Sequence, residues 1–366
     1  MPTTKKYKII ISGGGTGGHI FPALSIANAL KRRTNCEILF IGAENRMEME
    51  KVPAAGYKII GLPVAGFNRA NLFKNIEVLK KLWQSMTKAR QIIKEFNPDI
   101  AIGVGGYASG PILKAAQKAG IPTLLQEQNS FAGVTNKLLA KKAKKICVAY
   151  EGLERFFPKD RIIMTGNPVR KDILTYTKTA GEARLSFGLN PDKPTVLVVG
   201  GSLGARTLNN ALINKLEYIV NSGIQLIWQT GKNFGDKGTN AAKGIKGVVV
   251  TQFIADMAQA YAAATLVVSR AGAGSISELE LLGKPSILVP SPNVAEDHQT
   301  KNAMALVEKD AALMIADNEA IEKLADNIIS TIRNEQLIEQ MSYNIKKLAL
   351  HDSDNKIVDE ILKIIN

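Results

Sequence analysis

One local pattern occurs twice in this chain and limits its fold more than any other feature. Residues 9–19 and 196–206 each begin with an apolar, β-branched run, pass through a glycine-rich turn and continue into a helical pattern. A strand, a tight glycine turn and a helix in this order open a domain with a parallel sheet of the nucleotide-binding type. Because the two copies begin about 187 residues apart, the sequence predicts two Rossmann-like domains in tandem.

Short β-branched segments alternate with helical patterns along the chain, which is typical of βαβ units. The predicted strands of the first series are 8–11, 38–41, 100–103, 123–126, 145–148 and 162–165. Those of the second series are 195–199, 226–229, 247–251, 266–268 and 286–289. The main predicted helices are 22–33, 76–95, 112–119, 207–220 and 353–366, with Ser353 as the expected cap of the last. The fold class is therefore α/β.

The expected domain boundary lies near Asn167–Arg170, after the last strand of the first series. Residues 1–168 then form an N-terminal domain, and residues 169–352 form a C-terminal domain. The terminal helix, 353–366, has one apolar face, which we expect to pack back on the N-terminal domain.

Composition places the chain among soluble globular proteins. Of its 366 residues, 45% are hydrophobic and 22% are charged, so wholesale disorder is excluded. The two cysteines, Cys36 and Cys147, are too few for a disulfide scaffold and indicate a reducing, cytoplasmic setting. Apolar runs are well short of the roughly 18–20 residues that cross a bilayer, and the first is too short for a secretory signal.

The positive charge is concentrated in the first half of the chain. Residues 1–170 contain 27 Lys and Arg against 11 Asp and Glu, whereas residues 171–366 contain 20 against 22. A basic half favours an anionic partner, which can be nucleic acid, anionic lipid or a phosphorylated substrate. The alternative is a solvated lysine surface in a basic proteome.

Three glycine-rich turns follow predicted strands, at 13–18, 200–204 and 270–275. Glycine allows backbone N–H groups to approach a phosphate closely, and the positive end of the following helix attracts the anion. One such turn is equally explained by a tight connection without a ligand. Because all three are expected at the carboxyl ends of parallel strands, they predict a nucleotide-phosphate site.

Two side chains beside these turns are candidates for chemistry. His19 begins the first helix, whose positive end disfavours protonation and leaves a neutral imidazole able to act as a base. The alternative is a structural histidine bonded to loop carbonyls. Glu278 lies one turn into the helix after the third glycine turn, where a carboxylate can accept both ribose hydroxyls of a nucleotide. Its alternative is a favourable charge at a helix N-terminus.

Six motifs, taken together and in order, resemble the MurG family of bacterial lipid-linked N-acetylglucosaminyltransferases of peptidoglycan synthesis. They are residues 13–19, 105–111, 127–129, 166–170, 200–205 and 297–303. The resemblance runs over nearly the whole chain. It implies a glycosyltransferase of the GT-B type, with two Rossmann-like domains whose parallel sheets face a deep cleft. Such an enzyme moves N-acetylglucosamine from UDP to the C4 hydroxyl of undecaprenyl-pyrophosphoryl-N-acetylmuramoyl-pentapeptide (lipid I) with inversion, giving lipid II.

The resemblance also implies which residues bind the donor, UDP-N-acetylglucosamine. In the C-terminal domain they are Ser202, Ile254, Ala273, Gly274, Ser275, Ile276, Ser277, Glu278 and Gln299. Ile254 is expected to meet uracil through its backbone, and Gln299 to bind hydroxyls of the donor sugar. Arg170 is expected to reach the donor from the linker, and Thr16, Gly17, Gly18 and Asn129 to close on it from the N-terminal domain.

Two residues are candidates for the general base. Some relatives carry histidine before the Glu127–Asn129 motif, where this chain has Gln126. His19 is therefore the better candidate and Glu127 the second. No cofactor or metal is expected: the one Asp-x-Asp string, 352–354, is interpreted as a helix cap, and 296–298 lacks metal-ligand partners at a convincing spacing. Loop amides and helix ends would stabilise departing UDP.

A lipid acceptor implies a peripheral enzyme on the cytoplasmic face of the inner membrane, bound to its anionic leaflet. Two segments fit this interpretation, namely 67–83, which mixes apolar side chains with lysines, and the basic turn 141–145. The alternative for 67–83 is a helix packed on the domain core, and the alternative for 141–145 is a solvated turn.

Other function classes remain as alternatives. They include a UDP-N-acetylglucosamine epimerase and a GT-B transferase with a soluble acceptor, neither of which needs a membrane surface. An NAD-dependent oxidoreductase is disfavoured by the missing dinucleotide fingerprint. No nucleic acid partner is expected, because the chain lacks a helix-turn-helix, zinc-knuckle or aromatic RNA signature.

Overall fold

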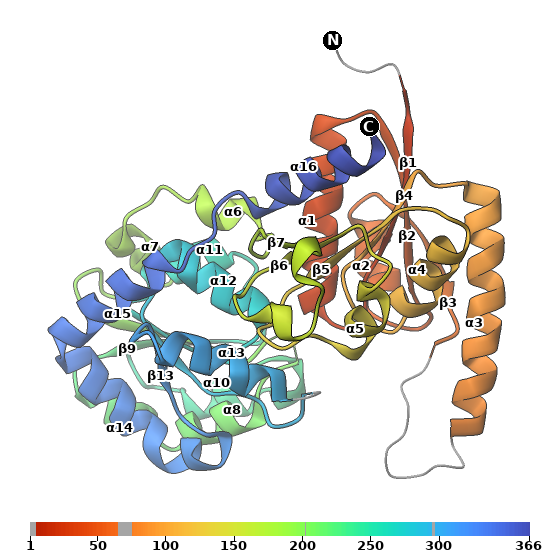
Figure 1. Ribbon diagram of the computed structural model, residues 1–366. Helices are drawn as coiled ribbons and strands as arrows, with labels where there is room; N and C mark the ends of the chain where they lie inside the picture. Colours follow the sequence, from red (N-terminus) through yellow and green to blue (C-terminus); the bar gives the residue numbers. More distant parts are fainter. Residues whose placement is uncertain (1–4, 65–74, 202, 295–296) are drawn as a thin grey trace. The chain divides into compact units, whose positions relative to one another are not determined.

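The computed structural model describes residues 5–64, 75–201, 203–294 and 297–366 (Figure 1). The chain divides into two compact units, which we call unit 1 (Met1–Val169 with Leu350–Asn366) and unit 2 (Arg170–Ala349). The two crossings between the units lie one and three residues from the expected boundaries.

Unit 1 is built on a seven-stranded parallel sheet in the order β3-β2-β1-β4-β5-β6-β7. Its strands are β1 (Tyr7–Ser12), β2 (Cys36–Ala43), β3 (Lys58–Leu62), β4 (Ile100–Gly103), β5 (Thr123–Glu127), β6 (Lys145–Val148) and β7 (Ile162–Met164). Central strands of a parallel sheet are covered on both faces, which explains the unbroken apolar runs of β1 and β4.

Helices cover both faces of this sheet. They are α1 (Gly17–Arg33), α2 (Glu48–Ala54), α3 (Asn75–Phe96), α4 (Ser109–Lys118), α5 (Val134–Ala140) and α16 (Ser353–Ile365). Ile9 and Ile11 pack with α1, α2 and α16, whereas Ile10 packs with α3, α4 and α5, because successive side chains of a strand point to opposite faces. Figure 1 shows α16, from the end of the chain, lying beside α1.

Unit 2 repeats the plan with six parallel strands in the order β10-β9-β8-β11-β12-β13. The strands are β8 (Thr195–Val199), β9 (Gln225–Gln229), β10 (Val248–Thr251), β11 (Leu266–Ser269), β12 (Ser286–Leu288) and β13 (Leu313–Met314). The helices are α6 (Lys171–Leu174), α7 (Ala180–Ser186), α8 (Arg206–Ile213), α9 (Leu216–Asn221), α10 (Lys237–Ala241), α11 (Met257–Ala263), α12 (Ala273–Leu282), α13 (His298–Val307), α14 (Ala320–Arg333) and α15 (Glu335–Lys347).

Both sheets have the strand order of a Rossmann domain, so the prediction of two such domains is confirmed. The order reverses between β1 and β4 in unit 1 and between β8 and β11 in unit 2. Ligands of open α/β sheets bind beyond the carboxyl ends of the strands at this reversal. The three glycine turns follow β1, β8 and β11 and therefore lie at these positions.

Several predicted elements were wrong in detail. The first helix begins at Gly17 rather than Pro22, because the helical turn forms before the proline and loses only the one N–H that proline lacks. Residues 207–220 form two helices, with Asn214 and Lys215 between them. The edge strands β3 and β13 were missed, because their few residues carry little alternating pattern. Ser353 donates to the Leu350 carbonyl and does not cap α16.

Candidate active site

The first glycine turn, residues 13–16, connects β1 to α1 at the carboxyl edge of unit 1. Gly17 and Gly18 begin α1, and exposed Thr16 precedes it with an extended backbone. His19 is the third residue of α1, so the helix holds its imidazole beside the turn. The structure thus brings Thr16, Gly17, Gly18 and His19 together at the predicted edge of the sheet.

The His19 ring is oriented by a backbone carbonyl. Its Nδ1 lies 3.0 Å from the oxygen of Gly14 and 3.4 Å from Thr16 Oγ1. A carbonyl oxygen only accepts, so the closer contact assigns the proton to Nδ1 and makes Nε2 the basic nitrogen of the neutral ring. The two interpretations of His19, a base and a histidine bonded to a loop carbonyl, are therefore compatible.

Glu127 has a different environment. It ends β5, is buried, and accepts four hydrogen bonds: from Asn129 N and Nδ2 at 3.2 and 3.3 Å, Gly133 N at 3.0 Å and Asn136 Nδ2 at 2.9 Å. Such a carboxylate organises the loop after β5 and holds Asn129 in place. Its lone pairs are already used by the protein, which makes it a poorer acceptor for a substrate proton than His19.

Gln126, which precedes the Glu127–Asn129 motif, is fully buried. Its amide nitrogen donates to Asn167 Oδ1 at 2.9 Å, and its amide oxygen accepts from Gln128. Gln126 therefore ties the loop after β5 to the segment after β7 and has no basic atom to offer.

In unit 2, the third glycine turn leads into α12, and the six residues of the predicted donor segment form its first turn and a half. They are Ala273, Gly274, Ser275, Ile276, Ser277 and Glu278. Ala273, Ile276 and Ser277 are buried, whereas Gly274 and Ser275 are partly exposed at the N-terminus of the helix. An ideal Cβ at Gly274 meets nothing within 4 Å, so the backbone there borders open space.

Glu278 is held by a buried tyrosine and an arginine. Tyr261, in α11, donates to Glu278 Oε2 at 2.8 Å, and Arg170 Nε lies 3.9 Å from Oε1. Burial raises the pKa of Glu278, although Tyr261 and Arg170 oppose the shift. Burial and the adjacent carboxylate together raise the pKa of Tyr261 well above its usual value, so its hydroxyl stays a donor. Arg170, Tyr261 and Glu278 thus form one cluster at the second turn of α12.

The second glycine turn, after β8, is shaped by a glutamine. Gln229 ends β9, accepts from Gly200 N at 3.1 Å and donates to the Gly201 carbonyl at 2.8 Å. Gly204 has a φ of 84° and packs directly on the Thr230 carbonyl, a position that no side chain could occupy. Ser202 itself lies outside the described residues, so its predicted contact with the diphosphate remains a prediction.

Two further predicted donor residues lie on loops and helices of unit 2. The Ile254 side chain is buried in the loop between β10 and α11, which leaves its backbone as the part that can meet a base. Gln299, in α13, accepts from Ser291 N at 2.8 Å through Oε1, so its amide N–H groups are what it can present to a sugar hydroxyl.

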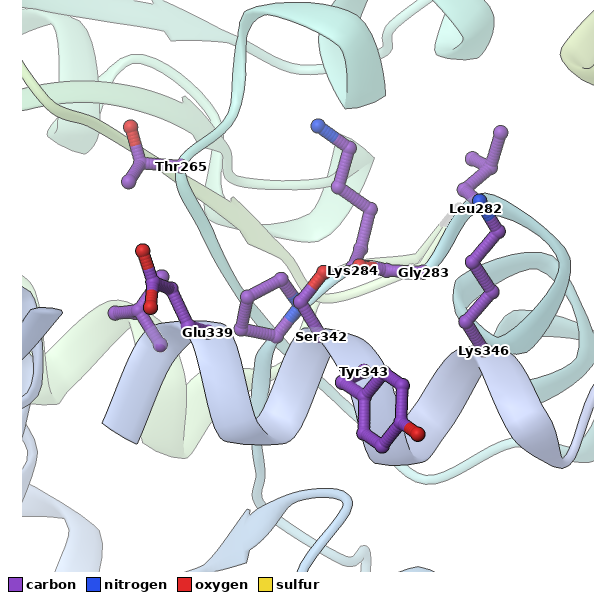
Figure 2. Close-up of a pocket in the computed structure, with 10 residues that line it drawn as sticks. Thr265, Leu282, Gly283, Lys284, Glu339, Ser342, Tyr343 and Lys346 are labelled. Atoms are coloured by element: carbon purple, nitrogen blue, oxygen red, sulfur yellow. Dashed lines mark hydrogen bonds between the residues drawn. The ribbon is translucent and has the colours of Figure 1, made fainter. Parts of the chain in front are cut away.

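A pocket of about 490 Å³ opens elsewhere in unit 2 (Figure 2). Thr265 and Lys284 line it just before β11 and β12, and Glu339, Ser342 and Tyr343 of α15 form the other wall. It therefore lies at the amino edge of the sheet, opposite the glycine turns. Burial lowers the pKa of Lys284 to about 8, and its ammonium donates to the Ala264 carbonyl at 2.8 Å. We do not assign this pocket to the donor.

The described residues bear on two further questions, metal binding and membrane contact. In 5–64, 75–201, 203–294 and 297–366, no three His, Cys, Asp or Glu side chains are grouped so that they could hold a metal ion. Asp354 pairs with Arg32 at 2.9 Å, and Asp352 accepts from the Asn355 amide at 2.6 Å. Glu296 lies outside the described residues. Among the described helices, none is long and apolar enough to cross a membrane.

Sequence reasoning missed three residues that shape these turns: Glu48, Gln229 and Tyr261. Glu48 is fully buried and accepts from Gly15 N and Ala43 N, both at 2.9 Å. None of the three belongs to a glycine motif, and each comes from a neighbouring strand or helix. Glu48 stands among the charged residues Glu44, Arg46, Glu50 and Lys51, so the local sequence gives no signal that it is buried.

Two Rossmann units with glycine turns at their carboxyl edges, an imidazole beside the turn in one and a cluster around a partly buried carboxylate in the other, are typical of the GT-B class of glycosyltransferases. Comparison with family models refines this. The model of the glycosyltransferase family 28 N-terminal domain matches residues 9–148, and that of the family 28 C-terminal domain matches residues 195–357. The chain therefore belongs to glycosyltransferase family 28, as the resemblance in its motifs implied.

Relatives that match the chain over nearly its full length show which members of the family it is similar to. The UDP-N-acetylglucosamine–N-acetylmuramyl-(pentapeptide) pyrophosphoryl-undecaprenol N-acetylglucosamine transferase of Bacteroides thetaiotaomicron is 60% identical over 365 residues, 98% of each chain. The crystal structure of Acinetobacter baumannii MurG matches with a TM-score of 0.79 at 29% identity, covering 98% of this chain and 100% of that one. A putative UDP-N-acetylglucosamine 2-epimerase of Listeria monocytogenes shares the fold alone, with 14% identity, a TM-score of 0.68 and coverage of 98% and 96%.

Proposed function

We propose that this chain transfers N-acetylglucosamine from UDP-N-acetylglucosamine to the C4 hydroxyl of lipid I, forming lipid II with inversion. The printed activity of the 60% identical relative supports the reaction. The structural observation that supports it most is the His19 imidazole, held by Gly14 with its basic nitrogen at the carboxyl edge of unit 1. A protein that only bound a nucleotide, without catalysing a reaction, would need no base at that position.

In this proposal unit 2 binds the donor. The carboxylate of Glu278 accepts from the ribose hydroxyls, and Tyr261 and Arg170 hold it for that role. The backbone of Ile254 meets uracil, and the amide of Gln299 donates to hydroxyls of the sugar. Ser202 and the amides of residues 273–277 bind the diphosphate, because N–H groups at the start of α12 carry the positive end of the helix dipole.

Unit 1 supplies the base. Nε2 of His19 takes the proton of the acceptor C4 hydroxyl as its oxygen bonds to the anomeric carbon, and the bond from that carbon to the UDP oxygen breaks. Loop amides stabilise the negative charge on departing UDP. Thr16, Gly17, Gly18 and Asn129 contact the donor from this unit, with Glu127 holding Asn129 rather than acting as the base. No step requires a metal or a cofactor.

A donor and acceptor screen tests the reaction. Purified enzyme is offered radiolabelled UDP-N-acetylglucosamine, UDP-N-acetylgalactosamine or UDP-glucose with a short-chain lipid I analogue, with and without EDTA. We expect product with UDP-N-acetylglucosamine and lipid I analogue, unchanged by EDTA. Conversion of the donor without any acceptor would instead indicate the epimerase, and transfer only to soluble acceptors would indicate the other GT-B alternative.

The acceptor is a lipid, and we propose that unit 1 lies on the anionic cytoplasmic leaflet as a peripheral enzyme, with no nucleic acid as partner. Unit 1 carries 28 Lys and Arg against 15 Asp and Glu, whereas unit 2 carries 19 against 18. In α3, Leu79 and Trp83 are 55% and 70% exposed, next to Lys80 and Lys81. Exposed apolar side chains among lysines are typical of interfacial binding. Residues 67–74 of this segment lie outside the described residues.

The basic turn 141–145 adds charge to the same unit. Lys141, Lys142 and Lys144 are exposed, and Arg161 bonds to the Lys141 and Ala143 carbonyls at 2.5 and 2.9 Å, which holds the turn in shape. Near an anionic surface each lysine contributes about 1 kcal/mol to binding.

Sedimentation with liposomes tests the membrane proposal. We expect the enzyme to pellet with vesicles that contain anionic lipid at low salt, to bind less at high salt, and to bind neutral vesicles weakly. The double variant Leu79→Ser, Trp83→Ser should lose most of this binding while donor affinity is retained. As a control, Ile321→Ser removes a 52% exposed apolar side chain from unit 2 and should leave binding unchanged. Equal loss in both variants, or no binding by the native enzyme, would contradict the proposal.

A further inference from the structure

Glu48 and His19 contact opposite sides of one peptide group. The N–H of Gly15 donates to Glu48 Oε2 at 2.9 Å, and the carbonyl of Gly14 lies 3.0 Å from His19 Nδ1. These two groups belong to the same Gly14–Gly15 peptide, in which a trans bond directs the N–H and the C=O to opposite sides. The structure contains no cis peptide bonds among its described residues. A carboxylate, a peptide and an imidazole thus form a continuous hydrogen-bonded chain.

We propose that Glu48 is a positioning residue for His19, acting through the Gly14–Gly15 peptide. Its buried negative charge polarises that peptide, so the Gly14 oxygen becomes a stronger acceptor for the Nδ1 proton. This holds the ring in the tautomer whose Nε2 is basic and fixes its orientation. The arrangement does for His19 what a directly bonded carboxylate does for the histidine of a hydrolase triad. It rests on the role of His19 in the proposed function.

The glycines of unit 1 are arranged around this chain. A Cβ at Gly14 would collide with the Glu48 carboxylate. A Cβ at Gly106 would lie 2.5 Å from the Gly14 oxygen, and one at Gly105 would lie 2.8 Å from His19 Nε2. Gly105 and Gly106 also have φ values of 95° and 88°, which favour glycine. These three glycines leave room for the carboxylate, the peptide and the ring to meet, which a tight strand–helix turn alone does not require.

The position of Glu48 also argues against a diphosphate bound to the Gly15 N–H. That donor already has an anionic partner, and Glu48 Oε1 accepts from Ala43 N at 2.9 Å as well. A second anion at the same N–H would meet the repulsion of a buried carboxylate. The Gly14–Gly15 peptide of the first glycine turn is therefore used to hold the base, which leaves Thr16, Gly17 and Gly18 for contact with the donor.

The first test uses the native protein and needs no variant. The chain has three histidines, so the ring nitrogens of ¹⁵N-histidine-labelled enzyme give a small set of signals, which a His19→Ala sample assigns. At a pH where the ring is neutral, we expect His19 to show a protonated Nδ1 and an unprotonated Nε2. A protonated Nε2 in the native enzyme would overturn the proposal outright, whether or not His19 is the base.

The second test removes the charge. In Glu48→Gln we expect a measurable population of the Nε2-protonated tautomer, a fall in kcat of about tenfold or more, and a KM for UDP-N-acetylglucosamine within about twofold of native. Glu48→Asp keeps the charge and should recover the native tautomer at least in part. Glu44→Gln, in the connection just before α2 and paired with Lys88 at the surface, is the matched control and should change neither signal nor turnover.

The outcomes separate the two proposals. If Glu48→Gln folds, keeps the native His19 tautomer and loses activity, Glu48 is merely structural and the inference fails. If Glu48→Gln does not fold, the ¹⁵N signals of His19 in the native enzyme and in Glu48→Asp decide whether the inference holds. If the tautomer shifts as expected but His19→Ala retains its turnover, the link between Glu48 and His19 stands and the role of His19 as base fails.

Discussion

His19→Ala should reduce the turnover of lipid I by about 10²- to 10⁴-fold, the usual contribution of a general base. The affinity for UDP-N-acetylglucosamine should stay within about twofold, because the side chain belongs to unit 1 and its proposed partner is the acceptor hydroxyl. The carbonyl of Gly14 loses one hydrogen bond in this variant, while the Gly15 N–H keeps its bond to Glu48. The turn should therefore keep its shape.

Single-turnover transfer to a short-chain lipid I analogue measures the chemical step, and isothermal titration with UDP-N-acetylglucosamine measures donor affinity. His351→Ala is the control, since His351 is an exposed histidine of the same unit, just before α16. Near-normal turnover in His19→Ala would remove this residue as the base and return Glu127 to that role. A parallel loss of donor affinity would show that the imidazole binds the donor instead.

Glu278→Gln should weaken binding of UDP-N-acetylglucosamine by about 10- to 100-fold, with a smaller effect on kcat. Hydrogen bonds to a charged acceptor contribute roughly 1.5–3 kcal/mol, and the amide accepts at one oxygen in place of two. Glu280→Gln, on the same helix, is the matched control. Burial raises the pKa of Glu280 to about 8, so this carboxyl is mostly protonated at pH 7 and the substitution changes little charge. Equal affinities in the two variants would refute the ribose role of Glu278.

The pH dependence of donor affinity follows from the same carboxyl group. Burial is the largest influence on Glu278 and raises its pKa, so it takes up a proton at a higher pH than an exposed glutamate does. The charged form accepts from the ribose, so affinity is complete above the pKa of Glu278 and is lost as the pH falls through it. Titrations of native enzyme and Glu278→Gln over the mildly acidic range should show this decline only in the native enzyme.

Much of the fold could be predicted from local patterns. The apolar runs at 9–11 and 196–199 predict buried parallel strands because their side chains must be apolar on both faces, and the structure places both at the centre of a sheet. The edge strands β3 and β13 were missed because they lack such an apolar run. β3 is half-buried and β13 has two residues, so neither carries a run long enough to recognise.

The candidate site could be predicted less completely. His19 and Glu278 follow glycine turns directly, so their place at the carboxyl edge is a matter of a few residues of chain. Whether they could act depended on partners that are distant in the sequence. Glu48 is 33 residues from Gly15, and Tyr261 is 17 residues from Glu278. Parallel strands are joined by crossover helices, so groups that meet at one edge of the sheet come from separate connections.

The sequence by itself determined the two Rossmann units, the three glycine turns and the side chains placed beside them, because periodicity and the need for glycine are properties of a few consecutive residues. Only the tertiary structure decided the protonation site of His19, the use of Glu127 as a loop organiser and the cluster around Glu278. The cluster around Glu278 joins two separate helices. His19 and Glu127 bond to groups of their own loops, and there the folded path of the loop decides which donor meets which acceptor, because no periodic pattern records it.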